Sequence, residues 1–133
     1  MPDPFPIEAV NHIARVTHDL EASLVFYQNV LGFRPIRRPN FQFPGAWLFN
    51  YGVQIHLIAT SERNAPTSDI SMRDDHVAFH VTDTDVVEKL LAEHGIDYRK
   101  NYVADTQVTQ LFFLDPDGNH IEIGTYPPAQ ELA

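Results

Sequence analysis

An internal repeat is the feature that most constrains how this chain can fold. The tetrapeptide at residues 11–14, Asn-His-Ile-Ala, reappears at residues 75–78 as Asp-His-Val-Ala, and an acidic helix start follows each copy, at Asp19 and Asp83. The two halves also end alike, with a pair of apolar strands joined by a turn that contains glycine. Each half is therefore predicted to contain one strand, one helix and then three further strands.

The repeat divides the chain into two similar modules. Module one is predicted to span about residues 8–59 and module two about residues 75–126. Residues 60–74 lack apolar periodicity and are expected to link the modules. The full length of 133 residues suits one domain, residues 1–133, because a domain usually has about 100–200 residues. The predicted fold class is α+β, with two tandem βαβββ modules.

One amphipathic helix is predicted in each module. The first follows Asp19 as its N-cap, continues for about three turns to Leu31, and is followed by Gly32, where a helix often ends. The second follows Asp83 and ends at Gly95. The predicted apolar stripes are Leu20, Leu24, Tyr27 and Leu31 in the first helix and Val86, Val87, Leu90 and Leu91 in the second.

The composition excludes several classes of protein. Nine Lys and Arg residues against eighteen Asp and Glu residues give a net charge of -9, which argues against nucleic-acid binding. The chain has no apolar run long enough to span a membrane and no visible secretory signal, so a cytoplasmic protein is expected. The absence of cysteine leaves seven histidines and the carboxylates as candidate metal ligands.

Strand alternation places polar side chains on the sheet faces that point away from the helices. In module two, Val77 and Phe79 are predicted to pack under the helix, which turns His76 and His80 to the opposite face. The closing strand is predicted to bury its isoleucines in the same way. The other residues predicted on these open faces are His12, Gln54 and His56 in module one and His120 and Glu122 in module two.

The repeat puts a possible metal ligand at four equivalent points, with His12 and His76 on the opening strands and His56 and Glu122 on the closing strands. If the modules face each other about a pseudo-twofold axis, three imidazoles and one carboxylate converge. This set suits Zn, Ni, Co, Fe or Mn better than Ca or Mg. A carboxylate between two isoleucines is costly to bury without a partner, which also favours a cation beside Glu122.

The remaining histidines, arginines and aromatic residues have open interpretations. His18 and His94 are interpreted as structural, because each lies at a predicted helix end. Two interpretations stay open for the aromatic residues on the predicted strands, which are to line a substrate pocket or to form ordinary core. Two also stay open for the arginines, which are to hold an anionic group of the substrate or to form a solvated edge. The candidate substrate-binding residues are His80, His120, Arg37, Arg38, Trp47 and Phe49.

Several motifs resemble the vicinal oxygen chelate superfamily, which includes glyoxalase I, fosfomycin-resistance transferases, extradiol dioxygenases and metal-free bleomycin-binding proteins. The motifs are Asn-His-Ile at 11–13, Phe-Tyr at 26–27, Leu-Gly-Phe at 31–33, Asp-His-Val-Ala-Phe at 75–79 and Phe-Leu-Asp-Pro-Asp-Gly-Asn-His-Ile-Glu at 113–122. The resemblance covers about residues 8–126 and is greatest to small glyoxalase I-like, or lactoylglutathione lyase-like, proteins. It implies a curved mixed sheet around a central metal site.

The resemblance also implies one divalent metal ion that chelates two neighbouring oxygens of a substrate or intermediate. His12, His76 and Glu122 match the common metal triad of the superfamily, and His56 matches its fourth ligand position. Glyoxalase I typically has a second glutamate at that fourth position. With histidine there, Glu122 is the main candidate for the catalytic base, and glutathione is a possible cosubstrate.

The leading functional hypothesis is a metal-dependent, glyoxalase-like enzyme. It would catalyse lyase or isomerase chemistry on a small α-oxo or vicinally oxygenated substrate through a metal-bound enediolate. The alternatives are an extradiol ring-cleavage dioxygenase and a metal-independent protein that binds a drug or metabolite. A homodimer is expected, with the ligands drawn from one subunit or from two. Neither nucleic acid nor a membrane is expected as a partner.

Overall fold

The computed structural model describes residues 2–61 and 69–133 and divides the chain into two compact units, residues 1–63 and 64–133. The central part of the predicted linker, residues 62–68, lies outside the described residues. Among the helices of the described ranges, none has the length and apolar character needed to cross a membrane.

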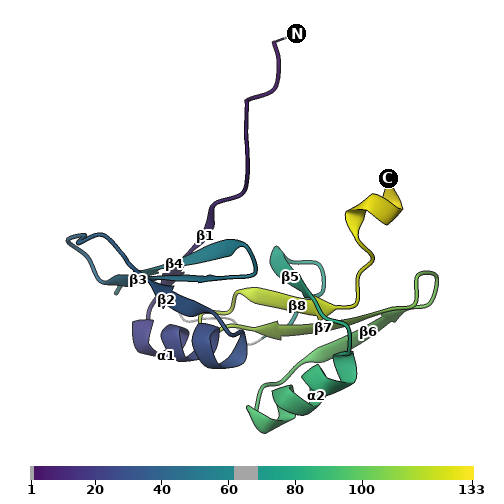
Figure 1. Cartoon of the computed structure of the whole chain (residues 1–133). Helices are drawn as coiled ribbons and strands as arrows, with labels where there is room; N and C mark the ends of the chain where they lie inside the picture. Colours follow the sequence, from purple (N-terminus) through teal and green to yellow (C-terminus); the bar gives the residue numbers. More distant parts are fainter. Residues whose placement is uncertain (1, 62–68) are drawn as a thin grey trace. The chain divides into compact units, whose positions relative to one another are not determined.

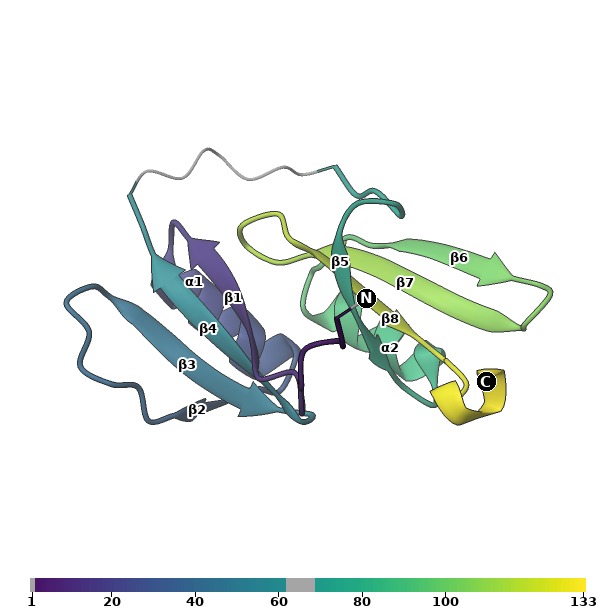
Figure 2. The same cartoon turned by 90° about the horizontal axis from the view of Figure 1, so that it is seen from above.

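The first unit contains one helical segment and four strands, shown in Figure 1. Its strands are β1 (His12–Thr17), β2 (Arg34–Ile36), β3 (Gly45–Asn50) and β4 (Val53–Ala59), and its α-helix is α1 (Leu20–Val25). The strands form a sheet in the order β1-β4-β3-β2, which can be followed in Figure 2. The β1–β4 pair is parallel and the other pairs are antiparallel, so the sheet is mixed.

The second unit repeats this plan. Its elements are β5 (His76–His80), α2 (Thr84–Glu93), β6 (Arg99–Val103), β7 (Val108–Leu114) and β8 (His120–Gly124), followed by a short 3-10 helix, Ala129–Leu132. The strand order is β5-β8-β7-β6, and only the β5–β8 pair is parallel. The predicted α+β class and the two tandem βαβββ modules are therefore confirmed, with a separate four-stranded mixed sheet in each unit.

The first helical segment differs from the predicted regular helix. Asp19 is its N-cap as predicted, and the aspartate side chain accepts a hydrogen bond from the Ala22 backbone at 3.0 Å. After Val25 the chain widens into a π-helical stretch, Phe26–Val30. Phe26 and its neighbour Tyr27 in this stretch are both buried.

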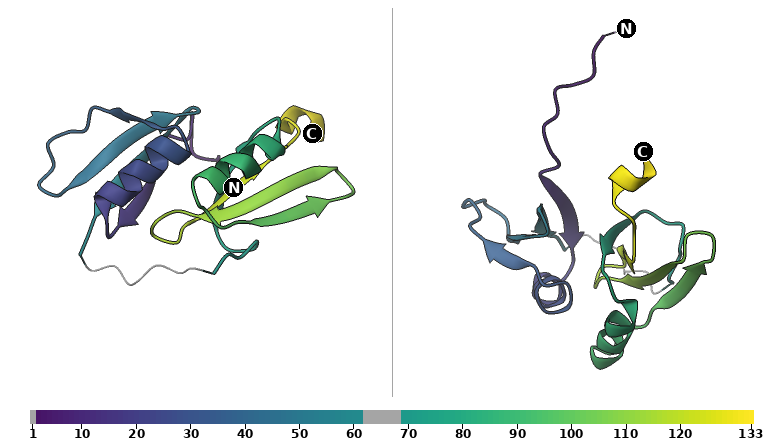
Figure 3. Two further views of the ribbon diagram at one scale, coloured as in Figure 1. Left: turned by 90° about the horizontal axis from the view of Figure 1, so that it is seen from below. Right: turned by 45° about the vertical axis from the view of Figure 1, so that its right-hand side comes forward.

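In each unit the helix covers one face of its own sheet, as the left view of Figure 3 shows. The first core lies under α1 and the π-helical stretch, and the second lies under α2. The main buried residues are Tyr27, Phe33, Leu48, Ile55 and Leu57 in the first unit and Leu91, Leu111, Phe113, Ile121 and Ile123 in the second. In α2 only part of the predicted apolar stripe is buried, because Val86 and Leu90 are about half exposed, at 52% and 45%.

Candidate functional site

The register of the parallel strand pairs makes the two units equivalent on their open faces. In the first unit His12 pairs with Gln54, and His56 lies two residues further along β4. In the second unit His76 pairs with His120, and Glu122 lies two residues further along β8. Since paired residues project to the same face, each unit presents one opening-strand histidine beside one closing-strand ligand candidate.

His56 is enclosed between two other rings in the first unit. The His12 ring stacks on one face, with ring centroids 3.9 Å apart and planes 11° apart. Trp47, the cross-strand neighbour of His56 on β3, stacks on the other at 4.0 Å and 4°. Only the edges of the His56 imidazole therefore remain for polar contacts.

One edge of His56 is already engaged, because its Nε2 lies 2.8 Å from Oε1 of Gln54. With that oxygen as the acceptor, His56 carries its proton on Nε2, and Nδ1 keeps the lone pair. Burial, the nearby His12 and the Arg38 charge all lower the pKa of His56. His56 is thus held as a neutral imidazole with one nitrogen able to bind a metal.

His12 is oriented by its neighbour in sequence. Its Nδ1 lies 2.8 Å from Oδ1 of Asn11, which leaves Nε2 as the other candidate donor atom. A histidine that binds metal usually donates its second ring nitrogen to an oxygen in this way.

A pocket of about 190 Å³ adjoins these rings within the first unit. The Arg38 guanidinium lies over the Phe41 and Phe43 rings, 4.8 and 5.0 Å from their centroids, and donates to the Phe43 carbonyl at 2.9 Å. The pocket is lined by His12, Ala14, Arg38, Phe41, Phe43, Trp47, His56, Leu57 and Ile58. Of the substrate-binding candidates, Arg38 and Trp47 line it, whereas Arg37 and Phe49 are exposed and lie outside its lining.

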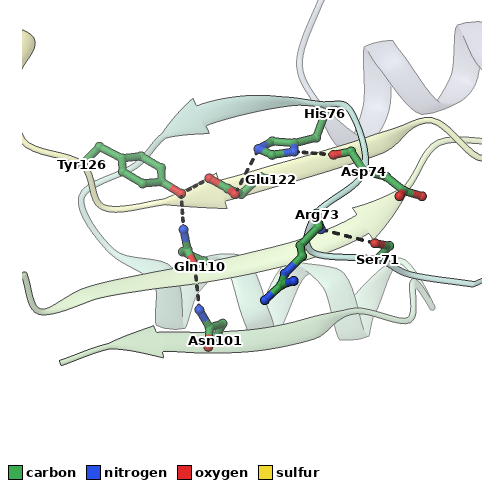
Figure 4. Close-up of polar contacts among 8 residues, drawn as sticks. All are labelled: Ser71, Arg73, Asp74, His76, Asn101, Gln110, Glu122 and Tyr126. Carbon is green, nitrogen blue, oxygen red and sulfur yellow. Dashed lines mark hydrogen bonds and ion pairs between the residues drawn. The ribbon is translucent and has the colours of Figure 1, made fainter. Parts of the chain in front are cut away.

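In the second unit, His76 and Glu122 lie side by side, as Figure 4 shows. Nε2 of His76 is 3.4 Å from Oε1 of Glu122, and Nδ1 of His76 bonds to the Asp74 carbonyl at 2.7 Å. The Glu122 residue is only 5% exposed. Burial raises the pKa of Glu122, and the neighbouring His76 opposes that rise.

A chain of hydrogen bonds reaches Glu122 along the same face of the sheet, from β6 and β7 (Figure 4). The Tyr126 hydroxyl donates to Oε2 of Glu122 and accepts from Nε2 of Gln110 at 3.4 Å. Gln110 in turn accepts from Nδ2 of Asn101 at 2.8 Å. The two oxygens of the Glu122 carboxylate are therefore divided, with Oε2 toward Tyr126 and Oε1 toward His76.

His80 and His120 contact the backbone through ring nitrogens. Nδ1 of His80 accepts a hydrogen bond from the Tyr126 backbone at 2.9 Å. Nε2 of the buried His120 accepts from the Ser71 backbone at 2.9 Å. These contacts hold Tyr126 and the segment before β5 against the second sheet.

The residues fit a divalent metal by their donor chemistry. His12, His76 and Glu122 each have one polar atom bonded elsewhere in the protein, and the second atoms of His76 and Glu122 face each other at 3.4 Å. Imidazole nitrogen and carboxylate oxygen are the donor types that a borderline ion prefers. Two of the four candidate ligands lie in each unit. Across residues 2–61 and 69–133, no three His, Asp or Glu side chains are gathered closely enough to hold a metal ion.

Sequence reasoning missed the roles of Gln54 and Tyr126. Gln54 lies on the open face by the same alternation that selects His56. Tyr126 lies four residues after Glu122, which is an even spacing, so continuing the alternation past the end of β8 would have placed it on the same face. Gly124, the residue between them on that face, has no side chain and so does not mark the alternation.

Residues 9–123 match the Glyoxalase/Bleomycin resistance protein/Dioxygenase superfamily, and the chain belongs to that superfamily. Among curated proteins, it is 44% identical over 126 residues to Glyoxylase I 4 of Arabidopsis thaliana, covering 91% of this chain and 72% of that protein. It is 28% identical over 128 residues to the metallothiol transferase FosB of Lysinibacillus sphaericus (strain C3-41), covering 90% of this chain and 83% of FosB.

Solved structures share the fold. A glyoxalase/dioxygenase from Nostoc punctiforme superimposes with a TM-score of 0.74 at 25% identity, covering 96% of this chain and 97% of that one. A glyoxalase family protein from Bacillus anthracis, at 23% identity, has the same TM-score and covers 96% of this chain and 100% of its own.

Proposed function

We propose that this protein is a metal-dependent lyase or isomerase of the glyoxalase I type, acting on a small α-oxo or vicinally oxygenated substrate. The observation that carries the proposal is the pair of His76 and Glu122, in which a buried carboxylate lies beside an imidazole that is oriented by a backbone carbonyl. The 44% identity to a protein named Glyoxylase I 4 supports the same class of reaction.

His12, His56, His76 and Glu122 would hold one divalent ion, of Zn, Ni, Co, Mn or Fe. The bound ion would supply Lewis-acid polarisation of two neighbouring substrate oxygens, which makes the adjacent C–H bond more acidic. For His56 the available atom is Nδ1, because Nε2 is engaged by Gln54.

Glu122 would accept the substrate proton and return it to the neighbouring carbon. Because burial raises its pKa, this carboxylate is a stronger base than an exposed glutamate. The oxygen that faces His76 is the one available for proton transfer, since Tyr126 engages the other.

The pocket of the first unit is the proposed binding site for an apolar part of the substrate. Its wall is aromatic, and Arg38 adds one positive charge whose Nε is buried and lacks a hydrogen-bond partner among the described residues. This wall favours a substrate with a planar or apolar group and a nearby anionic group. Trp47 is the single tryptophan of the chain, so quenching of its fluorescence would report ligand entry directly.

We further propose that the protein is a cytoplasmic homodimer and that glutathione serves as cosubstrate. Nucleic acid and membrane lipid have no part in the proposal, given the net charge of -9.

The proposal is tested by removing metal from the purified protein, restoring Co, Ni, Zn or Mn, and following the hemithioacetal of methylglyoxal and glutathione. Turnover is expected only in the loaded protein and should be lost in Glu122→Gln, which keeps the size of the side chain. Glu88→Gln, on α2 and outside the site, is the matched control. Absence of turnover in protein fully loaded with metal would rule out the glutathione-dependent reaction.

The same preparations separate the two alternatives. Iron-dependent oxygen uptake with a catechol would support the extradiol dioxygenase instead. Tight binding of a ligand whose affinity is unchanged in His76→Ala would support the metal-independent binding protein.

A further inference from the structure

An extended polar network in the second unit ends on Glu122, and Tyr126 is the residue that contacts its carboxylate. The network begins at Asn101 on β6, crosses Gln110 on β7 and reaches the Tyr126 hydroxyl, as Figure 4 shows. In each link the donor group points toward Glu122, so the tyrosine proton lies on the side of the carboxylate. The network thus presents an O–H donor to one chosen oxygen of Glu122.

Tyr126 is itself held in place at two further points. Its backbone N–H donates to Nδ1 of His80 at 2.9 Å. Its ring lies directly over Gly124, where a Cβ atom would come within 2.7 Å of the Cε2, Cζ and Oη atoms of the tyrosine. A side chain at position 124 would therefore require the Tyr126 ring to shift from its place beside Glu122.

We propose that Tyr126 is a positioning residue that fixes the Glu122 carboxylate in one orientation, keeping Oε1 directed toward His76 for metal binding and proton transfer. This inference rests on the proposed function, on its metal site for the first role and on its reaction for the second. A carboxylate without such a donor rotates about its last torsion, and its two oxygens exchange places. The Tyr126 hydroxyl removes that freedom before the metal or the substrate arrives.

Two neighbouring residues support the position of Tyr126. His80 accepts the hydrogen bond from the Tyr126 backbone, and Gly124, which has no Cβ atom, leaves space for the Tyr126 ring. Both act through Tyr126 rather than on the substrate.

The test compares Co²⁺ affinity, measured by competition with a chromophoric chelator, among the full-length wild-type protein and the variants Tyr126→Phe and Gly124→Ala. Both variants should bind Co²⁺ at least about tenfold more weakly, the usual effect of losing a group that orients a metal ligand. Tyr102→Phe is the matched control, because Tyr102 on β6 is 58% exposed and should leave the affinity unchanged.

Gly124→Ala keeps the Tyr126 hydroxyl but should displace the ring. It therefore tests whether the position of the hydroxyl matters, whereas Tyr126→Phe tests whether the hydroxyl itself matters. The double variant should bind Co²⁺ no more weakly than the weaker single variant, because both changes break the same hydrogen bond. In turnover assays Tyr126→Phe should lower kcat at saturating metal while KM stays within about twofold, since the substrate contacts remain.

Wild-type affinity in Tyr126→Phe would overturn the inference, and so would the failure of wild-type protein to bind Co²⁺. Loss of the folded state in metal-free Tyr126→Phe, seen by circular dichroism, would show a structural role and would also overturn it. If wild-type protein binds Co²⁺ but turns over no substrate, the proposed function fails while the affinity comparison still decides the role of Tyr126.

Discussion

His12 and His56 stack their imidazole rings 3.9 Å apart, although the two residues lie on different strands of the first sheet. Trp47 covers the opposite face of His56, so three aromatic rings from β1, β4 and β3 form one continuous stack. The stack orients both candidate metal ligands of the first unit before any metal binds.

Replacing Trp47 with leucine should therefore destabilise the first unit. The loss of ring burial and stacking should lower the free energy of unfolding by about 2 kcal/mol. Urea unfolding followed by circular dichroism checks this, since the variant has no tryptophan. Phe49→Leu, on the same strand and 40% exposed, should cost less than about 1 kcal/mol, and equal losses would contradict the importance of the stack.

A methyl group at Gly45 should disturb both β4 and Arg38. A Cβ atom there would lie 2.4 Å from the Leu57 carbonyl oxygen and 2.9 Å from a guanidinium nitrogen of Arg38. Because the backbone oxygen cannot move aside, Gly45→Ala should lower the free energy of unfolding by about 2–3 kcal/mol.

The comparison for Gly45→Ala is Gly52→Ala. Beyond its own chain neighbours, no atom of the described residues lies within 4 Å of a Cβ at Gly52, but its φ of +75° is unfavourable for alanine and should cost only about 1 kcal/mol. Thermal unfolding of the two variants separates steric contact from backbone strain, and a milder effect at Gly45 would refute the steric account.

Asp115 holds the turn that leads into β8. Its buried carboxylate accepts hydrogen bonds from the backbones of Asp117 and Asn119 at 2.9 and 2.8 Å, and from the Asn119 side chain at 2.8 Å. Asp115→Ala should lower the free energy of unfolding by about 2–3 kcal/mol, because these donors lose a charged acceptor. Chemical denaturation against Asp105→Ala, an exposed aspartate in another turn, is the measurement, and a difference below about 0.5 kcal/mol would contradict the prediction.

Glu88 should make stability depend on pH. The Tyr98 hydroxyl, at 2.8 Å, and then the Lys100 ammonium, at 3.0 Å, lower the pKa of Glu88 below its ordinary value of 4.5. The folded state thus favours the ionised form, so the contribution is present above pH 4.5 and is lost as the pH falls through the lowered pKa.

Glu88→Gln should accordingly lower the free energy of unfolding by less than about 1 kcal/mol at pH 7, because the ion pair is partly exposed. Below pH 4.5 this loss should become progressively smaller. Urea unfolding at a series of pH values measures the difference. The loss of stability in Tyr98→Phe should depend on pH in nearly the same way. If the free-energy difference between wild type and Glu88→Gln is constant across the pH series, this explanation is excluded.

Local patterns were enough to predict most of the fold. Asp19 and Asp83 cap their helices because a short acceptor before an apolar stripe acts within one turn. The alternation of Val77 and Phe79 with His76 and His80 survives in β5, since residue orientation along a strand depends only on parity. The π-helical stretch at Phe26–Val30 was not predictable in this way, because the spacing of Leu24, Tyr27 and Leu31 is that of a regular α-helix.

The sequence by itself determined the repeat, the strand–helix–strand order and the side of each sheet on which His12, His56, His76 and Glu122 lie, because period and parity are properties of neighbouring residues. Only the tertiary structure decided which groups meet those side chains. Arg38 lines the pocket while Arg37 beside it is exposed, and Tyr126 folds back onto Glu122 after β8 has ended. Such contacts depend on cross-strand register and on the side-chain conformations that packing selects, neither of which period and parity specify.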